Sequence, residues 1–209
     1  MGLFSFLTGK KEKDDVVSAE KPIRKERSLI EFPYTAMAIE TASKSSKSIC
    51  RIAFIAFSKD GHEVARESIY IKPKGKTFSF SNINGITAAD VANAPSFKEA
   101  WPRIEPYIKN STIAVHFGHF AQKCLSACLK DAGISGISCN ILDTKMLGEK
   151  MFPKLEFYNL ADVSCAACGW GPSAKDSTSK VLAISEIINY AAEKHPRKLK
   201  SVIYKEYLN

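Results

Sequence analysis

Three consecutive segments with β-strand character, joined by short connections, constrain this fold most strongly. Residues 35–41 and 49–57 are rich in apolar and β-branched side chains, and residues 63–71 alternate between polar and apolar types. Asp60-Gly61, between the second and third segments, is a typical hairpin-turn sequence. Short connections of this kind join antiparallel strands. This part of the chain is therefore expected to form an antiparallel three-stranded meander.

The hydrophobic periodicity changes after Pro73. Ser96 and Glu99 form a capping-box sequence ahead of an amphipathic segment, and Gly133 and Gly169 stand where helices commonly end. Helices are expected at 87–91, 96–108, 119–132, 144–151, 160–168 and 176–194, and strands at 112–116 and 140–143. This order predicts an α/β domain with a mixed five-stranded sheet, formed by the meander and two further strands, with helices on its faces.

The charge of the chain suits a polyanionic partner. Its 209 residues include 30 Lys and Arg against 22 Asp and Glu, a formal charge of +8. Residues 1–28 have an apolar start and mixed charge without periodicity, which predicts a flexible leader. Residues 29–195 are expected to form the globular domain and residues 196–209 a basic tail. Residues 1–7 or 197–209 are candidate docking segments for a protein partner.

The cysteines and the hydropathy favour a cytoplasmic protein without a membrane span. All six cysteines lie inside apolar, periodic segments, as reduced buried thiols do. Cys165 and Cys168 have the spacing of a redox motif or half of a zinc site, but the sequence offers no second pair. Residues 1–7 lack the basic start and cleavage site of a signal peptide, and no apolar run approaches 18 residues.

A single carboxylate, Glu40, stands at the end of the apolar segment 34–39. A buried charge without a partner is costly, so a carboxylate at this place indicates a binding function. The alternative is a glutamate at a solvated strand end. The binding function is favoured if other carboxylates of the chain converge on Glu40, and the solvated strand end if they do not.

Several fragments in sequence order identify a family resemblance. They are Glu40-Thr-Ala-Ser43, Asn84-Gly-Ile-Thr87, Val115-His-Phe-Gly-His-Phe-Ala121, Asp143-Thr144 and Asp176. From about Phe32 to His195 the chain resembles the DnaQ-like 3′–5′ exonucleases, the DEDDh branch of the ribonuclease H-like fold. The resemblance implies that fold, and a site that binds two Mg²⁺ or Mn²⁺ ions through four carboxylates beside a histidine general base.

The same resemblance predicts a degenerate active site. Glu40 and Asp176 are retained, while the positions of the other two aspartates and of the histidine are occupied by Ala38, Ala121 and Gly171. Two carboxylates cannot hold a pair of dications at ordinary affinity, so Glu40 and Asp176 are expected to bind at most one Mg²⁺ or Mn²⁺ ion weakly. Hydrolysis is expected to be lost or strongly impaired.

Five further residues are candidates for binding nucleic acid: Thr41, Ser43, Phe117, His119 and Phe120. The hydroxyls of Thr41 and Ser43 suit a phosphate, or a capped turn. Phe117 and Phe120 can stack on bases, or fill the space that the metals leave. His119 can replace a ligand, or cap a helix.

Three functions follow from the sequence. The leading one is an inactive or impaired exonuclease-type domain that binds the 3′ end of a single strand of DNA or RNA, or acts in a nucleic-acid-processing assembly. The first alternative is an active metal-dependent 3′–5′ exonuclease, with rerouted ligands or with aspartates at 38 and 121 replaced by alanine. The second alternative is a protein-interaction module.

Overall fold

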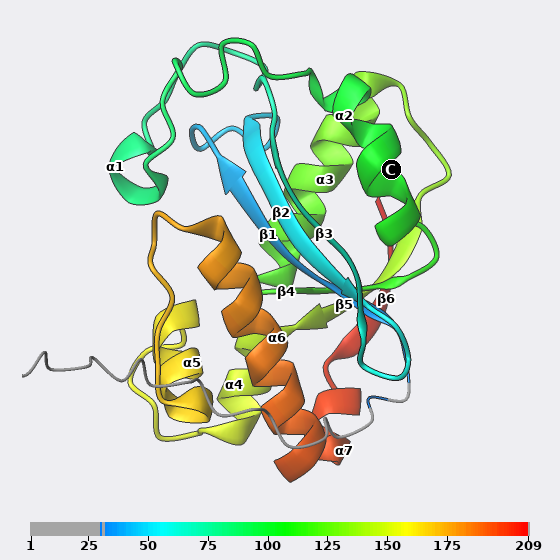
Figure 1. The fold of residues 1–209 in the computed structure, drawn as a ribbon, viewed down its shortest axis with the longest axis vertical. Coiled ribbons are helices and arrows are strands. Elements are labelled where there is room, and N and C mark those ends of the chain that lie inside the picture. Colours follow the sequence, from blue (N-terminus) through cyan, green and yellow to red (C-terminus); the bar gives the residue numbers. More distant parts are fainter. Residues whose placement is uncertain (1–29, 31, 209) are drawn as a thin grey trace, which may run out of the picture.

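The computed structural model describes residue 30 and residues 32–208, and a single mixed sheet runs through this part of the chain (Figure 1). The sheet has six strands in the order β3-β2-β1-β4-β5-β6. The strands are β1 Tyr34–Thr41, β2 Ile49–Phe57, β3 Glu63–Tyr70, β4 Thr112–Val115, β5 Ser138–Asp143 and β6 Ile203–Tyr207. The helices are α1 Ser81–Asn84, α2 Phe97–Ile104, α3 Gly118–Ala132, α4 Thr144–Met151, α5 Leu160–Cys168, α6 Ser177–Lys194 and α7 Pro196–Lys200.

The pairing of the strands confirms the mixed α/β fold and the meander. β1 pairs antiparallel with β2, and β2 with β3. β1 pairs in parallel with β4, and β4 with β5. The chain therefore enters the sheet as an antiparallel meander and continues through parallel crossovers. As a result β1 lies in the interior of the sheet, beside β4.

The sheet has a sixth strand that the sequence did not predict. The expected basic tail 196–209 instead contains α7 and β6, and β6 pairs antiparallel with β5. Val202 and Leu208 are buried, and the Leu208 amide donates to the Ile137 carbonyl at 2.9 Å. The charged residues Lys205 and Glu206 lie between these two buried side chains. The segment was therefore interpreted from its basic charge, and the strand was not predicted. Segment 197–208 is thus part of the domain, whereas candidate segment 1–7 lies outside the described residues.

The helix prediction was wrong at 87–91, where the chain forms turns. The Asp90 carboxylate accepts hydrogen bonds from both the amide and the hydroxyl of Thr87 at 2.7 Å, as in a helix cap. No regular helix follows it, and the short α1 lies just before it instead. The capping box of Ser96 and Glu99 is confirmed at the start of α2, which ends two residues after Pro102 and continues as a 3₁₀ turn.

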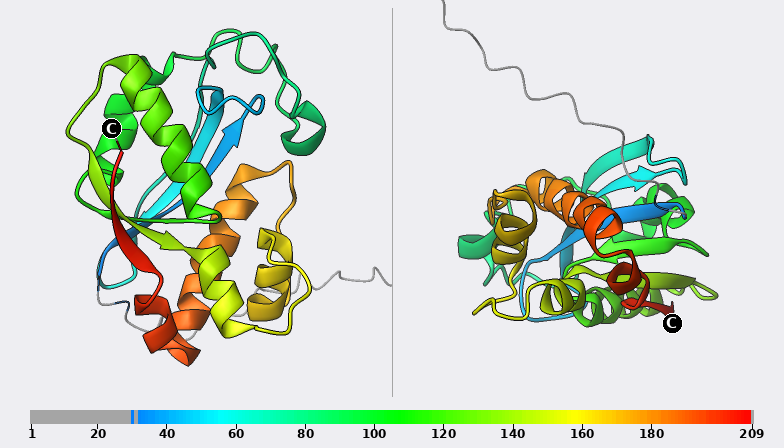
Figure 2. Two further views of the ribbon diagram at one scale, coloured as in Figure 1. Left: turned by 180° about the vertical axis from the view of Figure 1, so that it is seen from behind. Right: turned by 90° about the horizontal axis from the view of Figure 1, so that it is seen from below.

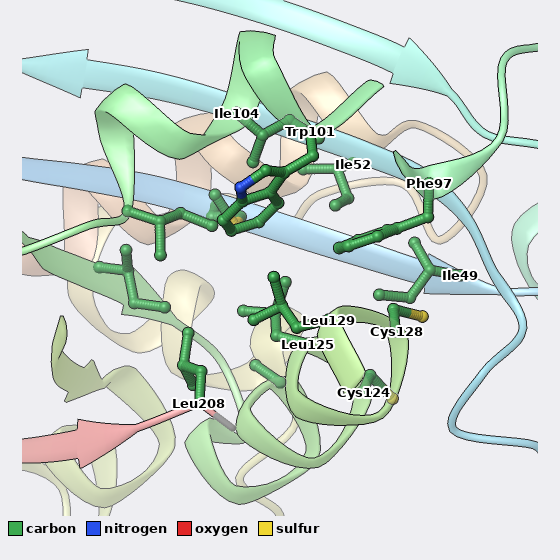
Figure 3. Close-up of a cluster of buried hydrophobic side chains, with 14 of the residues drawn as sticks. Ile49, Ile52, Phe97, Trp101, Ile104, Cys124, Leu125, Cys128, Leu129 and Leu208 are labelled. Carbon is green, nitrogen blue, oxygen red and sulfur yellow. The ribbon is translucent and has the colours of Figure 1, made fainter. Parts of the chain in front are cut away.

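Helices cover both faces of the sheet (Figure 2). On one face α2 and α3 bury a core in which Phe97 stacks on Trp101, with 5.6 Å between ring centroids, above Leu125 and Leu129 (Figure 3). On the other face α4, α5, α6 and α7 pack on Ala36, Ala38 and their neighbours. Within the described ranges, no helix is both long enough and apolar enough to cross a membrane. The two cores hold β1 between α3 and α6.

Candidate functional site

A cavity of about 210 Å³ opens where β1 and β4 end and α3 begins. Its lining includes Ala38 and Glu40 from β1, Phe120 and Ala121 from α3, and Lys180 from α6. β1 and β4 are parallel neighbours, so their carboxyl ends meet at the same edge of the sheet. In α/β folds ligands commonly bind at this edge.

Glu40 is buried and contacts α6 through one carboxylate oxygen, Oε1. The residue is 8% exposed, and its Oε1 accepts from the Lys180 ammonium at 2.6 Å and from the Ser177 hydroxyl at 3.1 Å. The Lys180 side chain is itself 19% exposed. The positive charge of Lys180 therefore compensates the buried carboxylate, which explains how the fold tolerates Glu40 at this place.

Asp176 does not join Glu40 in the way that the sequence predicted. It is exposed, forms the N-cap of α6, and accepts from the Thr178 amide at 2.9 Å. A residue at an N-cap directs its side chain to the amides of its own helix. The residues of α6 that contact Glu40 are Ser177 and Lys180, one and four positions later. The sequence contains a sign of this, because Ser177, Lys180 and Ile184 share one helical face.

The other positions of the expected active site are apolar or packed. Ala38 lies two residues before Glu40, so both side chains point to the same face of β1. Ala38 and Ala121 are 7% and 2% exposed, and both line the cavity. Gly171 packs against α5, because a Cβ added there would lie 3.2 Å from the Cys165 sulfur. A side chain at 171 would therefore be in tight contact with Cys165 and Ala161 of α5.

The side chains at this site do not fit a divalent metal ion. Throughout residue 30 and residues 32–208, no three His, Cys, Asp or Glu residues are grouped closely enough to hold one. Glu40 directs an oxygen at an ammonium group, so a dication at that oxygen has to displace Lys180. The sequence predicted a weak Mg²⁺ or Mn²⁺ site at Glu40 and Asp176. The Asp176 carboxylate caps α6 and does not contact the Glu40 carboxylate.

Phe117 and Phe120 place two aromatic rings at the mouth of the cavity, where they are 44% and 43% exposed. Phe117 has φ 65° and ψ 69°, in the left-handed region that bulky side chains rarely adopt. Among the described residues, one other non-glycine residue, Asn110, has a positive φ. Backbone strain of this kind is commonly found at functional sites.

His116 fixes the backbone beside Phe117. Its Nδ1 lies 3.0 Å from the Thr144 hydroxyl, and its Nε2 lies 2.9 Å from the Tyr158 carbonyl, which it donates to. Burial lowers the pKa of His116 to about 4, so the ring is neutral at pH 7. The imidazole therefore connects the end of β4 to α4 and to the segment before α5.

Asp143 organises the start of α3, a role that the sequence did not reveal. Its Oδ2 accepts from the Gly118 amide at 2.7 Å and its Oδ1 from the Lys145 amide at 2.8 Å. Gly118 is required sterically, because a Cβ there would lie 2.4 Å from the Tyr204 hydroxyl. Asp143 thus ties the first turns of α3 and α4 together and positions the segment that carries Phe117 and Phe120.

The remaining candidate residues lie around the site without contacting Glu40. His119 is exposed on α3. Thr41 is buried, and its carbonyl accepts from the Asn84 side chain at 3.0 Å. The Ser43 amide and hydroxyl both lie within 3.3 Å of the Ser48 hydroxyl, which stabilises the β1–β2 turn. The hydroxyl of Ser43 therefore has a structural partner.

Comparison with known proteins agrees with this geometry. A family model described as Exonuclease (RNase_T) matches residues 37–166. DNA polymerase III subunit epsilon of Buchnera aphidicola subsp. Schizaphis graminum is 35% identical over 102 residues, which cover 46% of this chain and 42% of that protein. The chain therefore spans less than half of the length of this curated relative.

Two solved structures share the fold at low sequence identity. Exonuclease X in complex with 5′ overhanging duplex DNA has a TM-score of 0.57 at 16% identity, covering 81% of this chain and 98% of that one. E. coli Exonuclease I in complex with a dA16 oligonucleotide has a TM-score of 0.66 at 15% identity, covering 81% of this chain and 42% of that one.

The chain belongs to the exonuclease family defined by this model, and it is of the DnaQ-like 3′–5′ type. Proteins of this type generally use divalent metal ions, Mg²⁺ or Mn²⁺. The cavity of this chain is lined by Ala38, Ala121 and the ion pair of Glu40 with Lys180.

Proposed function

We propose that this domain binds the 3′ end of a single-stranded nucleic acid and does not hydrolyse it. The observation that carries the proposal is the contact between the Lys180 ammonium and the Glu40 carboxylate, at 2.6 Å. The same cavity is lined by Ala38 and Ala121, at the positions where the resemblance implies aspartates. The Lys180 ammonium group supplies a positive charge beside Glu40, where the resemblance implies a metal ion.

The loss of chemistry follows from charge and coordination. A metal pair contributes to phosphodiester hydrolysis by activating water and by stabilising the attacking and leaving oxygens. Glu40 and Lys180 together carry no net charge, so nothing at the site attracts a dication strongly. A lysine ammonium group has no lone pair to offer a metal ion. Hydrolysis without that stabilisation is slower by orders of magnitude.

The capacity to bind is supported by the side chains that remain. Exposed aromatic rings stack on bases without sequence preference, and Phe117 and Phe120 present two such rings at the cavity mouth. The Lys180 ammonium lines the same cavity and can donate to a phosphate oxygen while it is held by Glu40. The charge of +8 attracts a polyanion. Exonuclease X and Exonuclease I were both solved with DNA, which is consistent with this ligand class.

The test uses the full chain and an end-labelled oligothymidylate. Binding, measured by fluorescence anisotropy, is expected to weaken steeply with salt, and the oligonucleotide is expected to remain intact with Mn²⁺ at high enzyme concentration. Phe117→Ala or Phe120→Ala should each weaken binding by about 5- to 150-fold, the range for loss of one stacked base.

Phe157→Ala is the matched control, because Phe157 is 61% exposed and does not line the cavity. It should leave the affinity unchanged. Shortening of the oligonucleotide would establish the active exonuclease instead. Absence of salt-sensitive binding would overturn the proposal and leave the protein-interaction function.

A further inference from the structure

A second cavity, of about 440 Å³, lies beside the other half of α3. Its lining includes Lys47 from the β1–β2 turn, Lys72 and Lys74 from the segment after β3, Lys98 from α2, and Asp131 from α3. We call this cavity the lysine groove. None of the residues named so far for the exonuclease-type site lines it.

The lysine groove has an excess of positive charge. The ammonium groups of Lys47 and Lys74 lie 3.1 and 2.7 Å from the same Oδ1 of Asp131. Their hydrogen bonds, that of Lys74 foremost, lower the pKa of the Asp131 carboxyl, so it is ionised at neutral pH. With Lys72 and Lys98 the lining has four positive side chains and one negative one, a net charge of +3.

The backbone that carries these lysines is held in place. The Lys72 amide donates to the Pro95 carbonyl at 2.8 Å, and Lys72 bridges Ser96 at the start of α2. The Cys128 thiol lies 3.7 Å from the Ser46 carbonyl, which connects α3 to the turn that contains Lys47. The charges are therefore grouped on a fixed scaffold.

The floor of the lysine groove is closed. Ile49, Phe97 and Cys128 form it and are 1%, 9% and 5% exposed, and they pack into the core of Figure 3. Four lysines line this groove, so a ligand with a row of negative charges complements its charge. A phosphodiester backbone has this form.

The lysine groove and the candidate site lie along the same helix, α3. Lys47, in the turn between β1 and β2, lines the groove, and Glu40, near the end of β1, lines the site. Ala121 lines the candidate site and Cys128 lines the groove, both on α3. Seven residues of α-helix span about 10 Å at ~1.5 Å per residue. That distance corresponds to about three nucleotides at the ~3.4 Å spacing of a stacked strand.

We propose that the lysine groove binds the phosphate backbone of the same strand, about three nucleotides away from the end that the cavity at Glu40 receives. This inference rests on the proposed function. The ligand class is single-stranded DNA or RNA, and the contribution of the groove is independent of base sequence. A strand of three nucleotides fills the site alone, whereas a longer strand also reaches the groove.

The experiment compares a three-nucleotide with a twelve-nucleotide oligothymidylate on the full chain. Lys72→Gln with Lys98→Gln should weaken binding of the longer probe and reduce its salt slope by about 1.4, at ~0.7 per lost single-strand phosphate contact. Binding of the shorter probe should not change. The control is Lys59→Gln with Lys154→Gln, the same loss of charge at exposed positions outside the groove.

Asp131→Asn tests the inference with the opposite sign. It releases the ammonium groups of Lys47 and Lys74, so the longer probe should bind more tightly and with a steeper salt slope. The inference would be overturned if the two double lysine variants changed the affinity for the longer probe equally, or if Asp131→Asn left that affinity unchanged. Binding of the short probe would still support the proposed function in that case. If neither probe binds, the proposed function has failed as well.

Discussion

The Lys180 ammonium lies 2.6 Å from Oε1 of Glu40, and the Ser177 hydroxyl donates to the same oxygen from 3.1 Å. Both donors come from the first turns of α6, and the acceptor comes from the end of β1. This contact joins the sheet to the helix that begins directly after Asp176. The contact stabilises the packing of α6 on the sheet, and it is also the reason why a metal ion does not fit at Glu40. Substitutions can separate these two roles.

Lys180→Met should destabilise the protein by about 1–3 kcal/mol, because it leaves the buried Glu40 carboxylate without its cation. The free energy of unfolding, from urea denaturation, measures this loss. The double variant Glu40→Gln with Lys180→Met should recover most of it, since no buried charge remains. An unchanged stability of Lys180→Met would contradict the importance of the pair.

We expect a variant to bind a divalent metal ion only when carboxylates are introduced at positions 38 and 121 and Lys180 is removed as well. Ala38→Asp with Ala121→Asp and Lys180→Asp places three acids beside Glu40, the number and type of ligands that a divalent ion needs. Calorimetric titration with MnCl₂ should give a binding signal for this variant and none for the wild type. Ala38→Asp with Ala121→Asp alone is the control, and it should bind Mn²⁺ much more weakly. Equal binding by both variants would show that Lys180 does not exclude the ion.

Phe117→Asn should separate stability from binding. Asparagine tolerates the left-handed backbone better than phenylalanine does, so relief of strain should raise the unfolding free energy by about 1 kcal/mol. The same change removes a stacking ring, so affinity for single-stranded oligonucleotides should fall. Phe120→Asn, in an ordinary helical position, should weaken binding without the gain in stability. A loss of stability in Phe117→Asn would show that the ring of Phe117 is a packing element.

Gly118→Ala should cost about 1–3 kcal/mol of stability, because its Cβ would approach the Tyr204 hydroxyl to 2.4 Å and the Ile141 Cγ2 to 2.9 Å. Thermal denaturation detects a loss of this size. Tyr204→Phe combined with Gly118→Ala removes the closest contact and should restore part of the stability. Tolerance of the single substitution would mean that α3 can shift away from β6.

Stability should fall on acidification through His116. Its pKa is lowered from 6.5 to about 4 by burial, so the unfolded state binds more protons in this interval. The contribution of His116 is fully present above pH 6.5 and is lost as the pH falls towards 4, on the order of 1–3 kcal/mol. Urea denaturation between pH 7 and 4 should therefore show a weaker pH dependence for His116→Gln than for the wild type. Parallel curves would exclude this role.

Local patterns predicted most of the fold. The alternation of residues 63–71, the hairpin at Asp60-Gly61 and the capping box at Ser96 depend on neighbours in sequence, and the structure confirms each of them. β6 was missed because segment 196–209 was judged by its basic charge, although Val202, Ile203 and Tyr204 are residues that favour strands. Val202 and Leu208 are buried.

The site was predicted less completely than the fold, for a physical reason. Glu40, Ala38 and Ala121 do line one cavity, as the resemblance implied. Asp176 satisfies the sequence motif but stands one residue before α6 begins, where its side chain caps the helix. The partner of Glu40 depends on the position at which α6 starts and on the reach of a lysine side chain, and neither follows from the spacing of a motif.

The most direct test of the central claim is the affinity for an end-labelled oligothymidylate in EDTA and in MnCl₂ at equal ionic strength, with the length of the oligonucleotide analysed afterwards. If Lys180 replaces the metal, the dissociation constant is the same in both buffers and the oligonucleotide remains intact. Binding that requires Mn²⁺, or a ladder of shortened products, would contradict the account.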